Sequence, residues 1–281
     1  MELYTDLHVH SNCSDGTFSP EELVFCAQKK GLCAFALTDH DTTAGIRRAA
    51  EAAAGTGVAV IPGVELSSGY RHRDIHILGL GVDPGNRQFQ QYLEQFQAAR
   101  TARNRKMIRR LAEHRVRISE EEMEAAFPDC IWTRAHFARY LRDHGYADSI
   151  KEAFARYVGD EAPCYVPKEQ IAPEEAVRRI LACGGHPVLA HPLLYHLEPS
   201  ALETLVRELC QEGLQGLEAI YSTNRFSDES AMKQLARRHG LCITGGSDFH
   251  GSNKPDIDLG CGKGNLKIPF SLWECLRDRR K

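Results

Sequence analysis

The sequence predicts an α/β protein in which parallel strands form a barrel interrupted by a helical insertion. Short apolar runs alternate with helical patterns in residues 1–84 and again from residue 185, which is typical of βα units. The stretch between them has a helical pattern and no convincing strand. Histidines and carboxylates recur where the predicted strands end, as in barrel enzymes whose catalytic residues gather on one rim.

The first part of the chain is expected to contain four strands and two helices. Ser19 and Glu22 form a capping box with Pro20 at the first helical position, so a helix should begin there and end at Gly31. The strands are expected at residues 4–10, 33–38, 58–66 and 74–82, and the second helix at 44–54.

The middle of the chain, residues 85–184, is expected to be a helical insertion or cap. A second capping box at Ser119 and Glu122, and a helix that begins at Thr133 and ends near Gly145, support this interpretation. Beyond it, strands are expected at 186–190, 217–221 and 241–244, with helices near 202–209 and 230–239. We therefore predict one barrel domain from residues 1–84 and 185–281, and an insertion of residues 85–184.

Composition excludes several classes of protein. The formal net charge of −3 gives no global positive field to hold long nucleic acid, although it allows local binding of nucleotides. The ten cysteines form no CxxC pair and lie mostly in apolar runs, which indicates reduced thiols. No signal peptide or membrane-span pattern is present. We expect a soluble, cytoplasmic protein without a membrane or a stable nucleic-acid partner; protein partners are not predicted.

Nine residues are placed as metal ligands would be. His8 and His10 share one face of a strand because side chains alternate along it. Asp15 lies in the following loop, and His76 lies within the fourth strand. Others stand at strand ends: His40, Glu65, His191, Asp248 and His250.

This mixture of imidazoles and carboxylates suits Mn, Fe, Zn or Co better than Mg, which avoids nitrogen ligands. Nine ligands are too many for one ion and enough for two or three, with Glu65 placed to bridge two of them. Paired metal ions stabilise the attacking and leaving oxygens of a displacement at phosphorus and lower the pKa of bound water.

These segments resemble the PHP (polymerase and histidinol phosphatase) family of metal-dependent phosphoesterases. The resemblance runs through Asp6-Leu-His8-Val-His10, Thr38-Asp-His40-Asp, Gly63-Val-Glu65 with His76, Ala190-His191-Pro, and Gly246-Ser-Asp248-Phe-His250. It implies a distorted (β/α)7 barrel and three metal sites. Their ligands would be His8, His10, Glu65 and Asp248 for the first; Glu65, His76 and His191 for the second; Asp15, His40 and His250 for the third.

Within the family, the chain looks most similar to nucleoside 3′,5′-bisphosphate phosphatases, with similar proteins trimming RNA from the 5′ end. It departs from them at Asn224, near which relatives often carry a histidine. The substrate-binding residues predicted on this basis are Arg134, His136, Lys168 and Asn224. Arg134 and His136 stand at a helix start, where backbone N–H groups and a guanidinium favour phosphate; the alternative for Arg134 and Lys168 is ordinary solvation.

Arginines and lysines also crowd residues 100–117. Two interpretations are open for this run: a patch that steers short RNA, or the solvent face of an ordinary amphipathic helix. Met107, Ile108 and Leu111 alternate with these charges at helical spacing, which favours the second interpretation, an amphipathic helix with a charged solvent face.

The predicted function is hydrolysis of a phosphomonoester of a small nucleotide by attack of a metal-activated hydroxide at phosphorus. The predicted substrate is a nucleoside 3′,5′-bisphosphate, with the 5′ ends of short RNA as a further substrate. Glu65, Asp248 and His191 are the predicted catalytic residues. Cyclic phosphodiesters are an alternative class of substrate. A metal-dependent amidohydrolase is a second alternative, but that class usually carries a carbamylated lysine where Glu65 stands. A regulatory domain that binds nucleotides without cleaving them is a third, and the full ligand set argues against it.

Overall fold

The computed structural model describes residues 2–128, 130, 132–167 and 171–280. Its centre is one eight-stranded sheet in the order β7-β6-β5-β4-β3-β2-β1-β8. The strands are β1 (Tyr4–Val9), β2 (Ala34–Leu37), β3 (Ala59–Tyr70), β4 (Arg73–Leu80), β5 (His186–Leu189), β6 (Gly216–Tyr221), β7 (Cys242–Gly246) and the two-residue β8 (Ile268–Pro269).

The two ends of the sheet meet, so the sheet forms a nearly closed barrel. The backbone N–H of Asp248, just after β7, donates to the carbonyl oxygen of His8 at 2.9 Å. The N–H of His10 donates in turn to the carbonyl oxygen of Phe249 at 3.0 Å. These bonds join the segment after β7 to the end of β1 and confirm the predicted α/β barrel.

The expectation that all strands are parallel is wrong for β4. It runs antiparallel to both β3 and β5, and it enters from a tight turn at Arg71 and His72, whose φ angles are +49° and +64°. Two left-handed residues make a hairpin turn, which can join only antiparallel strands. The hairpin places His76 opposite Ser67, near the end of β3. The short β8, antiparallel to β1, was also not predicted.

Helices cover the outside of this sheet. The four helices expected in the barrel part are present as α1 (Pro20–Lys29), α2 (Ile46–Ala53), α8 (Pro199–Gln211) and α9 (Phe226–Arg238), whereas α7 (Pro173–Ala182) and α10 (Ser271–Arg277) were not predicted. Ser19, Glu22 and Pro20 form the predicted capping box of the first one. Helix α7 packs on β3, β4 and β5, and α9 packs on β6. Short helical turns accompany them: η2 (Pro192–Tyr195), η3 (Gly251–Asn253) and η4 (Asp278–Arg280).

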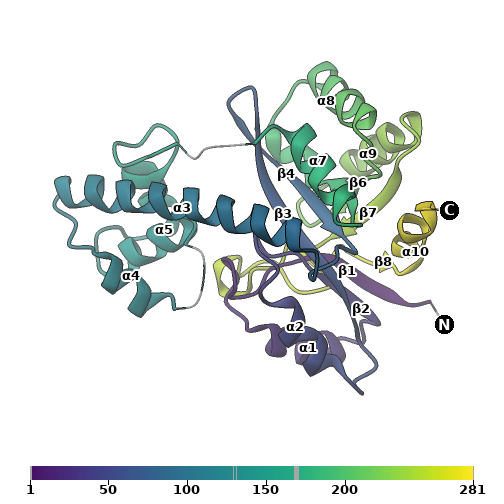
Figure 1. Cartoon of the computed structure of the whole chain (residues 1–281), viewed down its shortest axis with the longest axis horizontal. Helices are drawn as coiled ribbons and strands as arrows, with labels where there is room; N and C mark the ends of the chain where they lie inside the picture. The colour runs from purple at the N-terminus through teal and green to yellow at the C-terminus, as the bar shows by residue number, and fades with distance from the viewer. Residues whose placement is uncertain (1, 129, 131, 168–170, 281) are drawn as a thin grey trace.

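A helical lobe projects from the barrel (Figure 1). Its members are α3 (Arg87–Glu113), α4 (Glu120–Ala126), α5 (Arg134–Asp143), α6 (Ile150–Ala153) and η1 (Phe154–Val158). Their side chains form a hydrophobic core of their own, with Phe137 and Leu141 fully buried in it. The lobe lies within the predicted insertion 85–184. Because it has its own core, we propose the same division into barrel and insertion.

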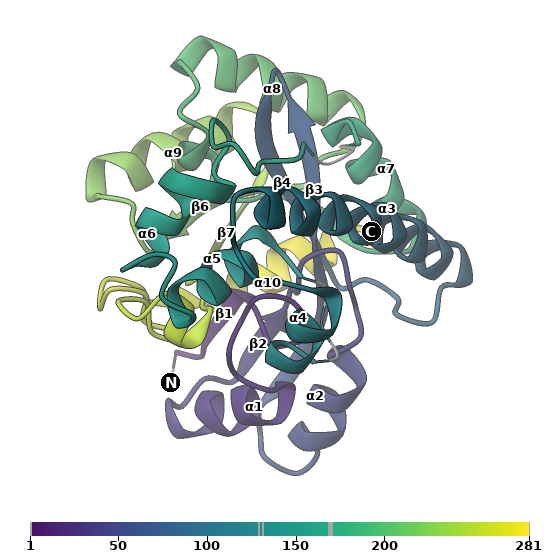
Figure 2. The ribbon, with the colours of Figure 1, turned by 90° about the vertical axis from the view of Figure 1, so that its left-hand side faces the viewer.

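The long helix α3 connects the two cores. Phe89 and Leu93, near its start, pack into the barrel core, whereas Met107 and Leu111 pack into the core of the lobe. Between these two apolar segments the buried positions are polar: Arg100, Arg103 and Asn104. Figure 2, viewed from the side of the lobe, shows α3 and α5 in front of the barrel.

In the part of the chain that the structure describes, no helix combines the length and apolar character needed to cross a membrane.

Candidate metal centre and substrate pocket

The structure brings all nine predicted ligand residues together at one end of the barrel. Their ligand atoms form four overlapping groups, in each of which all atoms lie within 4.8 Å of one another. The groups are His8, Glu65 and His191; His8, His10 and Asp248; His40, Glu65 and His76; and His10, Asp15, His40 and His250.

Glu65 lies at the centre of the cluster, and its two carboxylate oxygens face different histidines. Oε1 lies 2.8 Å from His76 Nδ1 and 3.1 Å from His191 Nε2. Oε2 lies 3.1 Å from both His10 Nε2 and His40 Nδ1. Neighbouring ligands of one transition-metal ion are separated by about 3–3.5 Å, as metal–ligand bonds near 2.1 Å require. The arrangement therefore fits a carboxylate that bridges two ions.

Asp15 organises the other side of the cluster. Its Oδ1 lies 3.2 Å from His250 Nε2 and 3.8 Å from His40 Nε2. The imidazole of His40 thus faces Asp15 with one nitrogen and Glu65 with the other.

Several of these buried atoms have no hydrogen bond, although buried polar atoms nearly always have one. They are Asp15 Oδ1, His40 Nδ1 and His76 Nδ1. Each faces other ligand atoms at ion-pair distance without hydrogen-bond geometry. Atoms arranged in this way are satisfied by a shared cation, so the residues present fit a metal centre.

The electrostatics of the cluster also favour cations. Burial alone would raise the pKa of Asp15, but His40 and His250 outweigh it and hold that pKa well below its ordinary value. Glu65 is likewise held well below its ordinary pKa, against burial, by His40 and His76. Burial lowers the pKa of the His40 imidazole well below its usual range, which favours the neutral form that binds metals.

The sequence did not single out the residues that hold these ligands in place. Glu218, fully buried in β6, lies 3.1 Å from His8 Nδ1 and accepts the backbone N–H of His191 at 2.7 Å. Tyr221 and Lys254 both donate to Asp248 Oδ2, at 2.7 Å and 2.6 Å. Only one of these supporting residues could have been suspected from the sequence: Glu218, because it is an acidic residue inside an otherwise apolar strand.

Two of the predicted ligands have a left-handed backbone. Their φ angles are +23° for His191 and +57° for Asp248. A non-glycine residue in this region is strained, and such strain concentrates at functional sites. Both residues lie just after a strand, where the chain must turn sharply to aim a side chain at the centre of the barrel end.

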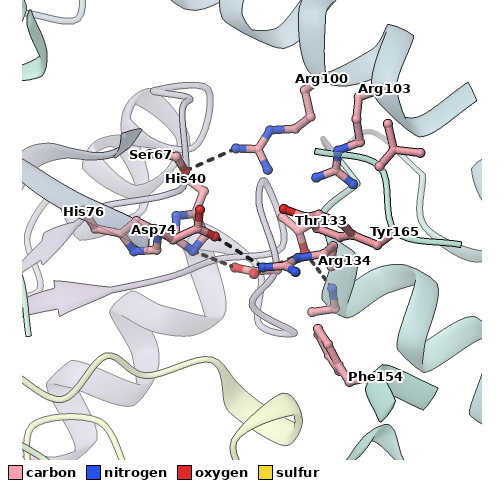
Figure 3. Close-up of a pocket in the computed structure, with 13 residues that line it drawn as sticks. His40, Ser67, Asp74, His76, Arg100, Arg103, Thr133, Arg134, Phe154 and Tyr165 are labelled. Carbon is pink, nitrogen blue, oxygen red and sulfur yellow. Dashed lines mark hydrogen bonds and ion pairs between the residues drawn. The ribbon is translucent and has the colours of Figure 1, made fainter. Parts of the chain in front are cut away.

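A cavity of about 180 Å³ lies between the metal cluster and the helical lobe. The barrel contributes Asp15, His40, Ser67, Asp74 and His76; the lobe and the segment after it contribute Arg100, Arg103, Thr133, Arg134, Ala135, Phe154, Tyr165 and Val166 (Figure 3). A larger cavity of about 620 Å³ adjoins it and shares Asp74, Arg134 and Tyr165.

The predicted substrate residues differ in their placement. Arg134 lines both cavities and pairs with Asp74 at 3.3 Å. His136 is buried and absent from both cavity walls; its Nδ1 accepts the backbone N–H of Thr133 at 2.9 Å in a capping box. Asn224 turns back to donate to the carbonyl oxygen of Ala219, also away from these cavities. Lys168 lies outside the described residues.

The interpretation of residues 100–117 as an ordinary solvent face is wrong for Arg100 and Arg103. Each is 6% exposed, and both line the smaller cavity. The periodicity identified the helix correctly, but the neighbour of this helix face is the cavity rather than solvent.

Comparisons with known proteins agree with this geometry. The PHP domain family matches residues 6–160. The 3′,5′-nucleoside bisphosphate phosphatase of Chromobacterium violaceum is 33% identical over 98% of this chain and 96% of its own length. The 5′-3′ exoribonuclease Rnm of Escherichia coli is 35% identical over 96% of this chain and 93% of its own. A Bifidobacterium adolescentis protein, assigned as a metal-dependent phosphoesterase, superposes with a TM-score of 0.87 at 29% identity, covering 99% of this chain and 96% of that one.

Proposed function

This chain belongs to the PHP family, and on that premise we propose that it removes one phosphate from a nucleoside 3′,5′-bisphosphate. At the coarser level it is a metal-dependent phosphoesterase, a hydrolase that acts on phosphoric ester bonds. The bisphosphate is the finer step, and it is suggested by the name of the Chromobacterium violaceum relative.

One observation carries the proposal: the cavity that opens on the cluster is walled by His40 and His76 on one side and by Arg103 and Arg134 on the other. Phosphoryl transfer needs metal ions at the reacting phosphorus, while guanidinium groups bind further phosphate oxygens through paired N–H donors. A small substrate with two phosphates matches a cavity with a metal-binding side and a cationic side.

The proposed ligands are the nine clustered residues: His8, His10, Asp15, His40, Glu65, His76, His191, Asp248 and His250. Two or three ions of Mn, Fe or Zn suit this donor set, and when bound they would supply an activated water and neutralise charge at the phosphoryl group. Glu65, Asp248 and His191 would be among the residues that hold these ions at the reacting phosphate. Tyr221 and Lys254 would orient the Asp248 carboxylate through their hydrogen bonds.

A second candidate substrate is the 5′ end of a short RNA, which the name of the Escherichia coli relative suggests. The adjoining cavity favours it, because a chain that leaves the smaller cavity past Arg134 would enter a space lined by His72, Arg73 and Tyr165. Base stacking on an aromatic ring and cationic contacts to the backbone are common in single-strand recognition.

The test is phosphate release by the Mn²⁺-reconstituted protein from adenosine 3′,5′-bisphosphate, beside AMP, histidinol phosphate and a 5′-phosphorylated RNA. Preferred release from the bisphosphate is the expected result. Preferential degradation of the RNA would select the second candidate. No release from any of them at full metal occupancy would overturn the proposal and lead next to cyclic phosphodiesters and amide substrates.

A further inference from the structure

Two cysteine thiols are in contact at the end of the barrel away from the metal cluster. Cys242 begins β7 and is buried, whereas Cys275 lies in α10 and is exposed. Their Sγ atoms are 3.0 Å apart, although 33 positions of sequence separate the two residues. Helix α10 packs on β7, on the side of the barrel opposite the helical lobe (Figure 1). Asp248 follows the other end of β7, so the thiol pair is separate from the site described above.

The two thiols differ in their surroundings. Burial, together with the hydrogen bond and the charge of Cys275, raises the pKa of Cys242 to about 11, so this thiol is protonated at neutral pH. The guanidinium of Arg279 acts on the same thiol in the opposite direction. Arg279 is fixed in place because it donates to the carbonyl oxygen of Gln215 at 2.5 Å and to that of Gly240. Cys275 is therefore the thiol that an oxidant in solution meets first, and Cys242 lies behind it.

We propose that Cys242 and Cys275 form a reversible redox site, in which a small disulfide such as glutathione disulfide oxidises them to an intramolecular disulfide between β7 and α10. Two observations support it: the two Sγ atoms are in contact, and an exposed thiol stands in front of a buried one. Side chains that already point at each other meet the geometric requirement of a disulfide. Redox-sensing cysteines are commonly accessible and placed beside a second cysteine that resolves the first product.

The oxidation consists of two exchange steps. The Cys275 thiolate attacks one sulfur of glutathione disulfide, the S–S bond of the oxidant breaks, and one glutathione leaves as a thiolate that takes up a proton. This step removes the two effects by which Cys275 raises the pKa of Cys242, and the effect of Arg279 remains. Cys242 then loses its proton, attacks Sγ of Cys275 and releases the second glutathione. The two protein thiols lose two electrons, and glutathione disulfide gains them.

The test is treatment of the full-length, Mn²⁺-loaded protein with glutathione disulfide, followed by digestion and mass spectrometry without reduction. We expect the intact protein to lose two hydrogen atoms and the digest to contain a cross-linked peptide with Cys242 and Cys275, which a phosphine reductant cleaves. Cys275→Ser should give no such peptide. Cys210→Ser removes a half-buried thiol of α8 and should give it as the unsubstituted protein does. Absence of the Cys242–Cys275 peptide from the unsubstituted protein, or a stable glutathione adduct on Cys275 in its place, would overturn the inference.

A thermal measurement tests the consequence for the fold. A cross-link between residues 242 and 275 restricts the unfolded chain, so oxidation should raise Tm of the unsubstituted protein and of Cys210→Ser by about 5–10 °C. Cys275→Ser should have the same Tm before and after treatment. Equal shifts in all three proteins would place the effect of the oxidant elsewhere and contradict the inference. Neither measurement uses a phosphate ester, so both are independent of the proposed function. Should Cys275→Ser not fold, Cys275→Ala takes its place with the same expectation.

Discussion

The carboxylate of Glu218 lies 3.1 Å from Nδ1 of His8, and both side chains are completely buried. This contact holds the imidazole so that its other nitrogen, Nε2, faces Glu65 and Asp248. A carboxylate behind a metal-binding histidine fixes the ring and its tautomer and raises its basicity. Glu218 also fixes the backbone of His191, so one side chain positions two proposed ligands.

We therefore expect Glu218→Gln to weaken Mn²⁺ binding by about 10–100-fold, the usual effect of losing such a partner. The amide still accepts the His191 N–H but no longer carries the charge that faces His8. Isothermal titration of the metal-free protein with Mn²⁺ measures the effect. Glu203→Gln, an exposed residue paired with Arg238, is the control. Unchanged affinity in Glu218→Gln would show that His8 needs no such support.

Substitution of the central ligands should abolish turnover while the fold persists. Glu65→Ala or Asp248→Ala removes a carboxylate from a cluster in which it faces several imidazoles. We expect phosphate release to fall to background and the bound metal to decrease by at least one ion per chain. Metal analysis, circular dichroism and phosphate assays together test this. A near-normal rate of phosphate release in either variant would contradict the proposed metal centre.

Removal of metal should destabilise the protein. The ligand cluster holds three buried carboxylates with four buried and two partly buried imidazoles, and several buried atoms of these groups have no hydrogen bond. A ligand that binds only the folded state stabilises it by about 2.7 kcal/mol at a concentration 100 times Kd. Chelation should therefore lower Tm by several degrees, and Mn²⁺ should restore it. A Tm that chelation leaves unchanged would contradict a tightly bound centre.

Much of the site follows from the sequence because strand geometry is local. The i, i+2 spacing of His8 and His10 places both on one face, and the ends of parallel strands share one rim, so the nine residues could be grouped in advance. The environment of Arg103 and the direction of β4 could not be predicted, because they depend on how elements distant in the sequence pack together. Arg103 has the helical spacing of a solvent-facing residue, and only the position of the barrel under α3 makes its environment a cavity. The reversal of β4 depends on the turn at Arg71 and His72, which contains none of the glycine or asparagine that usually marks a hairpin.

Arg134 should contribute to substrate binding rather than to the chemical step. It lines both cavities, whereas the proposed metal ligands lie on the barrel side. Arg134→Met should raise KM for the bisphosphate by about tenfold, with a smaller change in kcat. Arg142→Met, exposed on the same helix and paired with Asp143, is the control. A large loss of kcat at unchanged KM would assign Arg134 to the transition state instead.

His136 should make the protein acid-sensitive without contributing to substrate binding. Burial lowers its pKa to about 4, whereas the unfolded chain has a value near 6.5. Above pH 6.5 the group is neutral in both states; as pH falls from 6.5 toward 4 only the unfolded state takes up the proton, so stability is lost across that window. At pH 5 the loss is about 2 kcal/mol, or roughly 4–8 °C in Tm for a chain of this size.

Glutamine at this position can still accept the Thr133 N–H of the capping box but cannot titrate. His136→Gln should therefore lose less Tm than the unsubstituted protein between pH 7 and pH 5, with an unchanged KM at pH 7. Parallel acid curves for the two proteins, or a raised KM, would show that the imidazole acts on the substrate as first predicted.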